Sequence, residues 1–119
     1  MNGNRIILAA HRGDRKTAPE NTIPAFEKAI AFGVDMIETD IHMTKDGELI
    51  IMHDRNTLRT TGYNGLTDKM TFAEIKALDA GGRFLSDYKV LTVNCLSLIL
   101  STGLTSVAST VSRPSYQIV

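Results

Sequence analysis

The sequence predicts an α/β domain, and three neighbouring segments near the N-terminus carry that prediction. A continuous apolar run within "RIILAAHRG" ends at a glycine and is typical of a strand that is buried on both faces. "PENTIPAFEKAIAFG" has the end signals and apolar spacing of a helix, and "VDMIETDIHM" follows as a second strand. A strand, a helix and a strand within about forty residues indicate a βαβ unit with parallel strands.

The predicted helix has recognisable ends. Asn21 or Thr22 can cap its first turn, Pro24 is tolerated there, and Gly33 is expected to end it. Three apolar residues recur at helical spacing and are expected to face a core: Ile23, Phe26 and Ile30. Further along, Thr71 and Glu74 form the pattern of a capping box, which predicts a second helix that begins there.

A hairpin is predicted between the second strand and "ELIIMHD". If Asp46 and Gly47 form a two-residue type I′ turn, Asp40 lies directly opposite His53. Side chains alternate along a strand, so one face is then mostly polar and the other apolar. The polar face would hold Glu38, Asp40, His42, Ile51 and His53; the apolar face would hold Ile37, Ile41, Met43, Ile50 and Met52.

Composition restricts the function classes. The 119 residues suffice for one domain, and a net charge of zero does not favour nucleic acid or an anionic membrane as partner. The lone cysteine, Cys95, excludes an internal disulfide framework, and the N-terminal apolar run is too short for a signal peptide. We therefore expect a cytoplasmic protein that does not associate with membranes.

The composition changes near residue 88. All thirteen acidic residues lie from Asp14 to Asp87, all seven serines lie from Ser86 onward, and residues 90–111 carry no charge. We therefore divide the chain into residues 1–88 and an atypical C-terminal segment, residues 89–119. Three interpretations of this segment stay open: out-of-frame translation, a weak membrane-spanning or membrane-resting segment, and a β-rich segment that packs on the preceding strands.

Two clusters of ionisable residues are candidate sites. Glu38 and Asp40, two positions apart on one strand, offer oxygen ligands for Mg²⁺ or Ca²⁺, although they also suit an ordinary charged sheet face. His11 and Arg12 follow the first strand, at the end where parallel sheets bind ligands, and arginine suits phosphate. A structural role for each of these residues taken alone remains an alternative.

Taken together, the motifs identify a family. "HRG" at residues 11–13, "PENT" at 19–22, "IE.D" from residue 37 and "DG.LI..HD" from residue 46 resemble the glycerophosphodiester phosphodiesterases. The resemblance covers about residues 5–88 and includes a small insertion after the second histidine. It implies that the chain is the N-terminal part of a (β/α)₈ or TIM barrel, truncated to a few strands, with its site at the carboxyl ends of the strands.

The resemblance also implies an activity in lipid and glycerol metabolism: hydrolysis of a glycerophosphodiester to glycerol 3-phosphate and an alcohol. His11 and His53 would be the acid–base pair, and Arg12 would hold a phosphate oxygen. Glu38 and Asp40 would ligate a divalent cation, Mg²⁺ or Ca²⁺. Supporting roles fall to two "PENT" residues, Glu20 near the site and Asn21 as a helix cap.

The chain departs from the family pattern in length and in acidic residues. A TIM barrel needs at least about 200 residues, and the further carboxylate ligand that the family carries on a later strand has no counterpart after Asp87. The alternatives are a weak or inactive member and a lysophospholipase D-like phosphodiesterase. Because a partial barrel exposes apolar strand edges, we also expect self-association as a homo-oligomer.

Overall fold

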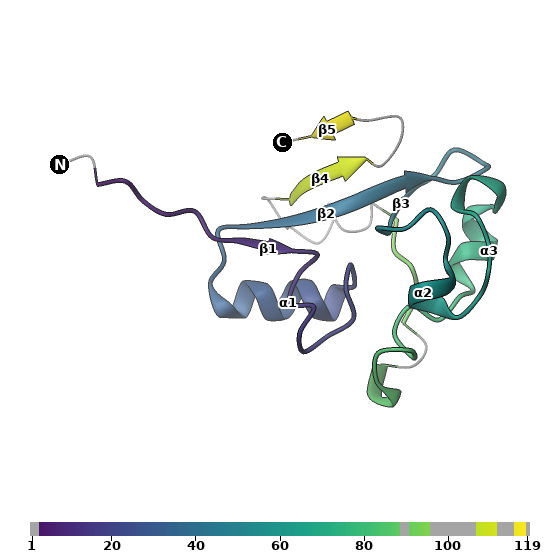
Figure 1. Ribbon diagram of the computed structural model, residues 1–119, viewed down its shortest axis with the longest axis horizontal. Helices are drawn as coiled ribbons and strands as arrows, with labels where there is room; N and C mark the ends of the chain where they lie inside the picture. Colours follow the sequence, from purple (N-terminus) through teal and green to yellow (C-terminus); the bar gives the residue numbers. More distant parts are fainter. Residues whose placement is uncertain (1–2, 89–90, 96–106, 112–115, 119) are drawn as a thin grey trace.

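A computed structural model describes residues 3–88, 91–95, 107–111 and 116–118. These residues form one sheet with a helix along one side and shorter helices at one end (Figure 1). The elements, in chain order, are β1 (Ala9–His11), α1 (Ile23–Phe32), β2 (Met36–Met43), β3 (Leu49–Ile51), α2 (Leu58–Thr61), the 3₁₀ helix η1 (Thr67–Lys69), α3 (Phe72–Lys76), the 3₁₀ helix η2 (Ser86–Tyr88), β4 (Val107–Val111) and β5 (Tyr116–Ile118).

The central strand of the sheet is β2. It pairs in parallel with β1, where His11 is the register partner of Glu38, and in parallel with β4 on its other side. The strand β3 returns antiparallel along the second half of β2, and β5 pairs antiparallel with β4. The predicted βαβ unit with parallel strands is therefore confirmed, and β1 and β2 end toward α2 (Figure 1).

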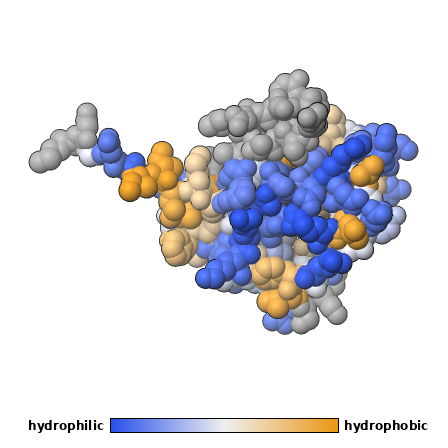
Figure 2. Space-filling model, in the orientation of Figure 1, coloured by the Kyte–Doolittle hydropathy of each residue, from blue (hydrophilic) through white to orange (hydrophobic). Residues whose placement is uncertain are grey.

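The first strand is shorter and more exposed than the sequence predicts. Ile6, Ile7 and Leu8 are 87%, 67% and 45% exposed and precede β1 as an extension that carries hydrophobic surface (Figure 2). The expectation of burial on both faces is wrong because β1 is the outermost strand of the sheet order and contacts the core chiefly through Ala10.

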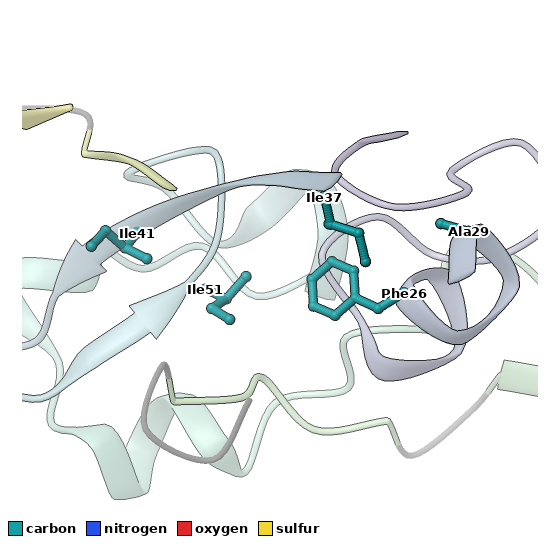
Figure 3. Close-up of a cluster of buried hydrophobic side chains, with 5 residues drawn as sticks. All are labelled: Phe26, Ala29, Ile37, Ile41 and Ile51. Carbon is teal, nitrogen blue, oxygen red and sulfur yellow. The ribbon is translucent and has the colours of Figure 1, made fainter. Parts of the chain in front are cut away.

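The helix α1 supplies the main core. Phe26 and Ala29 pack against Ile37 and Ile41 of β2 and Ile51 of β3 (Figure 3). Gly33 ends the helix as predicted. Its φ of 92° is a left-handed conformation that glycine adopts readily, and its N–H donates to the Ala29 and Ile30 carbonyls. Ile30 itself is 48% exposed, so the core face is centred on Phe26 and the two alanines, Ala25 and Ala29.

The hairpin has a different register from the predicted one. Ile41 pairs with Ile51 and His42 with Ile50. A hydrogen bond from the Thr44 N–H to the Glu48 carbonyl at 2.8 Å closes a loop of three residues, 45–47, with Gly47 at a φ of 87°. The Asp46 carboxylate stabilises the turn by accepting from the nearby Thr44 hydroxyl at 2.6 Å and from the distant Phe72 N–H at 2.9 Å. Asp40 therefore lies opposite Met52, whose N–H donates to its carbonyl at 3.0 Å.

The one-residue change of register moves side chains between faces. Ile51 joins the core beneath α1, whereas Ile50 and Met52 pack in a second cluster with Ile75 and Val93. Ile75 lies on α3, which begins at the predicted capping box of Thr71 and Glu74. That helix is short and ends at Lys76.

The C-terminal segment contributes strands to the same sheet. Residues 107–111 form β4, parallel to β2, and β5 follows it, which is the arrangement that the third interpretation of the segment predicts. Residues 96–106, the middle of the uncharged stretch, lie outside the described residues. Within the described residues, no helix is long and apolar enough to cross a membrane.

Candidate active site

The end of β1 places His11 and Arg12 against the acidic residues of β2. His11 Nε2 lies 3.6 Å from Glu38 Oε2, and the His11 side chain is 52% exposed. Arg12 is nearly buried, with Nε 3.3 Å from Asp40 Oδ2 and Nη1 3.4 Å from Glu20 Oε1. The Arg12 backbone has a φ of 63°, a strained conformation for a residue with a side chain, and such strain concentrates at functional sites.

Gly13 lets this loop approach α1. Its φ is 79°, and a Cβ atom there would lie 2.8 Å from the carbonyl carbon of Ala25. The next residue, Asp14, donates its N–H to the Ala25 carbonyl at 2.9 Å. A glycine is therefore required for both the backbone conformation and the close approach, and it holds the Arg12 loop against the helix.

Asn21 contacts the site instead of capping α1. The N-cap is Thr22, whose side chain makes no capping hydrogen bond and donates to the Pro19 carbonyl. Asn21 has a φ of 56°, accepts from the Thr39 hydroxyl at 2.5 Å and donates from Nδ2 to Asp40 Oδ2 at 3.5 Å. The predicted helix-cap role is therefore wrong, because the inward turn of the backbone directs this amide toward Asp40.

The second histidine is held by an adjacent carboxylate. His53 Nδ1 lies 2.6 Å from Asp54 Oδ1. The hydrogen bond from Arg59, supported by that from His53, lowers the pKa of Asp54 from 3.8 to about 2, so Asp54 is an acceptor near neutral pH. His53 Nδ1 then carries the proton of this bond, and Nε2 becomes the ring atom that can exchange a proton.

Arg59 joins the two halves of the site. Its guanidinium donates to Asp54 at 2.6 and 3.2 Å and to Glu20 at 2.6 and 3.0 Å. Burial opposes the charge of Glu20, but the hydrogen bond from Arg59 and the charges of Arg59 and Arg12 lower its pKa. These contacts form a continuous chain from Arg12 through Glu20, Arg59 and Asp54 to His53.

Sequence reasoning gave no role to Asp54 or Arg59. Asp54 was visible in the "HD" motif, but Arg59 lies in α2 within the small insertion, where nothing local marks it as a partner of Glu20. His42, expected on the polar face, is buried and donates from Nε2 to the His53 carbonyl at 2.9 Å. It therefore supports the backbone at His53.

Glu38 and Asp40 are the residues that could hold a metal ion. They lie two positions apart on β2, and their carboxylates contact His11 and Arg12 respectively. In the part of the chain that the structure describes, no three His, Cys, Asp or Glu side chains gather as a metal-binding cluster. The donor chemistry nevertheless fits Mg²⁺, which is often bound by one or two carboxylates together with water and substrate phosphate.

The fold and the site define a class of protein. It is an α/β protein with a histidine and a nearly buried arginine at the end of a parallel strand, a second histidine after an antiparallel strand, and a carboxylate beside each histidine. Residues 11–111 match the model of the glycerophosphoryl diester phosphodiesterase family. The chain therefore belongs to this family, and the match extends past residue 88 and includes β4.

Two bacterial relatives show the extent of the sequence similarity. The glycerophosphodiester phosphodiesterase of Caldanaerobacter subterraneus subsp. tengcongensis is 49% identical over 80 residues, which are 67% of this chain and 33% of that protein. A glycerophosphodiester phosphodiesterase of Bacillus subtilis is 46% identical over 88 residues, which are 74% of this chain and 30% of that protein. The chain thus spans about a third of the length of these relatives.

Solved structures also match most of this chain and less than half of the other protein. The crystal structure of glycerophosphodiester phosphodiesterase from Agrobacterium tumefaciens has a TM-score of 0.86 at 36% identity and covers 90% of this chain and 47% of that chain. A phosphodiesterase from Oleispira antarctica, solved with the product sn-glycerol-3-phosphate, has a TM-score of 0.81 at 32% identity, with coverages of 90% and 44%. The predicted fold, the N-terminal part of a TIM barrel, is confirmed.

Proposed function

We propose that the chain carries the acid–base half of a glycerophosphodiesterase site, which hydrolyses a glycerophosphodiester to glycerol 3-phosphate and an alcohol. One observation carries the proposal: contacts link Arg12, at the end of β1, through Glu20, Arg59 and Asp54 to His53. Family membership and the product in the Oleispira relative support the choice of substrate.

The histidines suit proton transfer in opposite directions. One imidazole would take the proton of the attacking hydroxyl group as its oxygen bonds to phosphorus. The other would donate a proton to the alcohol oxygen as the second phosphorus–oxygen bond breaks. Asp54 supports His53 in this role because its carboxylate fixes which ring nitrogen is protonated. Glu38 lies beside His11, with Oε2 3.6 Å from Nε2.

Arg12 is proposed to hold a phosphate oxygen. Its side chain is 11% exposed, and its Nε is buried without a hydrogen-bond partner although it lies 3.3 Å from Asp40 Oδ2. A donor that is desolvated but not hydrogen-bonded suits an incoming anion. Glu20 contacts Arg12 and Arg59 at once, which supports a positioning role for it.

A divalent cation, Mg²⁺ or Ca²⁺, is proposed at Glu38 and Asp40. The two carboxylates would hold the ion from one face of β2, with water and the diester as further ligands. When bound, such an ion neutralises negative charge on a phosphoryl group.

Release of glycerol 3-phosphate from glycerophosphocholine by the purified chain tests the proposal. Reactions would contain Mg²⁺, Ca²⁺ or chelator, with His11→Ala as the inactive variant and the exposed Glu27→Ala as a matched surface control. We expect metal-dependent turnover that only His11→Ala abolishes. Absence of turnover from a chain shown by circular dichroism to be folded would instead indicate a family member without activity, and lysophosphatidylcholine as substrate would reveal a lysophospholipase D.

A further inference from the structure

A basic cavity opens beside the candidate active site. It has a volume of about 510 Å³ and is partly open to solvent. Three segments that are distant in the sequence line it: the loop after β1, the helix α2, and the turn that follows α3. Its side chains include Arg15, Lys16, Arg59 and Arg83, with Pro19 and Phe84 as apolar walls.

The cavity carries excess positive charge although the chain as a whole is neutral. Glu20 is the single carboxylate among its lining residues, and its two oxygens already accept from Arg59. Within the described residues, Arg15, Lys16 and Arg83 form no ion pair. Three unpaired cations that converge on one concavity favour an anionic ligand.

Local hydrogen bonds order the backbone that carries these cations. Asp14 accepts from the backbone N–H groups of Lys16 and Thr17 at 3.2 and 3.3 Å. Asp79 Oδ1 accepts from the Gly81 and Gly82 N–H groups and closes the turn that precedes Arg83. The Tyr88 hydroxyl donates to the Thr17 carbonyl at 3.0 Å, which joins the C-terminal side of this turn to the loop after β1.

The basic cavity adjoins the second histidine. A smaller cavity is lined by His53 and Asn21, and it shares three residues with the basic cavity: Glu20, Thr60 and Ala80. A diester with its phosphate between His53 and Arg12 could therefore extend one of its two substituents past Glu20 into the basic cavity.

We propose that the basic cavity binds an anionic group, a phosphate or a carboxylate, on the alcohol half of the diester. This inference rests on the proposed function and names the substrate class that the function leaves open. Diesters whose alcohol carries a phosphate are preferred, because their second anion meets Arg15, Lys16 and Arg83. Diesters of a cationic alcohol such as choline are disfavoured by repulsion from the same residues.

Two probes that differ in the charge of the alcohol test the inference by binding. Isothermal titration calorimetry in chelator would compare glycerophosphoinositol 4-phosphate with glycerophosphocholine on the intact chain, so that no turnover is needed. We expect the phosphorylated diester to bind at least about tenfold more tightly, and the difference to shrink as salt screens the exposed cations.

Two double variants, each of which removes two positive charges, test whether the binding preference arises in the basic cavity. Arg15→Gln combined with Arg83→Gln removes two cations from the cavity, and Lys45→Gln combined with Lys69→Gln removes two exposed cations elsewhere. We expect the first pair to weaken binding of the phosphorylated diester about tenfold and the second pair less than about twofold. Equal effects of the two pairs, or equal affinity of the unaltered chain for the two probes, would overturn the inference.

Measuring the release of glycerol 3-phosphate from both diesters distinguishes the proposed hydrolytic function from the proposed role of the basic cavity. In one outcome, the chain binds the phosphorylated diester more tightly through the cavity but releases glycerol 3-phosphate from neither diester. That result supports the cavity as an anion site and refutes the hydrolytic function. Release from both diesters with equal KM supports the function and refutes the cavity's role. Release with a lower KM for the phosphorylated diester, raised by the Arg15→Gln and Arg83→Gln pair, supports both.

Discussion

Replacing Arg59 with glutamine is expected to destabilise the fold at neutral pH and to have little effect in strong acid. Arg59 lies on α2 and makes four hydrogen bonds to Glu20 and Asp54, which come from opposite sides of the site. Glutamine cannot neutralise either carboxylate, so two acidic groups would face each other without their shared cation.

The pKa of Asp54 gives the size of the expected destabilisation. Its decrease from 3.8 to about 2, caused first by the hydrogen bond from Arg59, corresponds to about 2.4 kcal/mol at about 1.36 kcal/mol per pKa unit. The Arg59 and Asp54 side chains are 48% and 30% exposed, and solvent screening reduces this value to about 1 kcal/mol. The two hydrogen bonds from Arg59 to the less exposed Glu20 contribute about 1 kcal/mol more, so we expect the free energy of unfolding to fall by about 2 kcal/mol.

The pH dependence has a definite sign. Folding lowers the pKa of Asp54 below its unfolded value of 3.8, so the stabilisation is complete above about pH 4 and is lost as the pH falls toward 2. The stability difference between the unaltered chain and Arg59→Gln should therefore be largest at pH 7 and small at pH 2.

Urea denaturation followed by circular dichroism at pH 7, 4 and 2 measures this difference. Arg55→Gln is a suitable control because its pair with Asp68 is exposed on both sides, and we expect it to change stability little. A loss below about 0.5 kcal/mol for Arg59→Gln at pH 7, or a loss that persists unchanged at pH 2, would refute the reasoning.

Three further predictions concern the loop, the buried amide and the sheet edge. Gly13→Ala should reduce the free energy of unfolding by about 2 kcal/mol in urea denaturation, because of its φ and the 2.8 Å approach to Ala25; a change near zero would contradict this account. Thr39→Val should cost about 1–3 kcal/mol by removing the donor to the buried Asn21 oxygen, and wild-type stability would count against that contact. The exposed apolar residues 6–8 beside β1 predict concentration-dependent self-association in sedimentation velocity, and a monomer at all concentrations would exclude it.

Local signals predicted the early part of the fold well. The α1 stop at Gly33 and the capping box at Thr71 are confirmed because each depends on residues close together in the sequence. The parallel pairing of β1 with β2 is confirmed because a strand, a helix and a strand in succession favour it. The ion pair of Arg59 with Glu20 could not be predicted, since Glu20 lies 39 residues away.

The hairpin shows where local reasoning failed. "KDG" fits both a two-residue and a three-residue loop, and the choice between them changes the partner of every residue in β3. The contact between Asp46 and the N–H of Phe72, 26 residues further along, favours the longer loop. Such a contact exists only after the chain has folded.

The sequence by itself determined the family, the α/β class, the order of the first elements and the identities of the ionisable residues, because motifs and short-range spacing encode these properties. Tertiary structure decided which of those residues meet: Arg12 with Asp40, Asn21 with Thr39, and Arg59 with both Glu20 and Asp54. The physical reason is that hydrogen bonds and ion pairs act over a few ångströms in space, so their partners are known only when packing brings distant segments together.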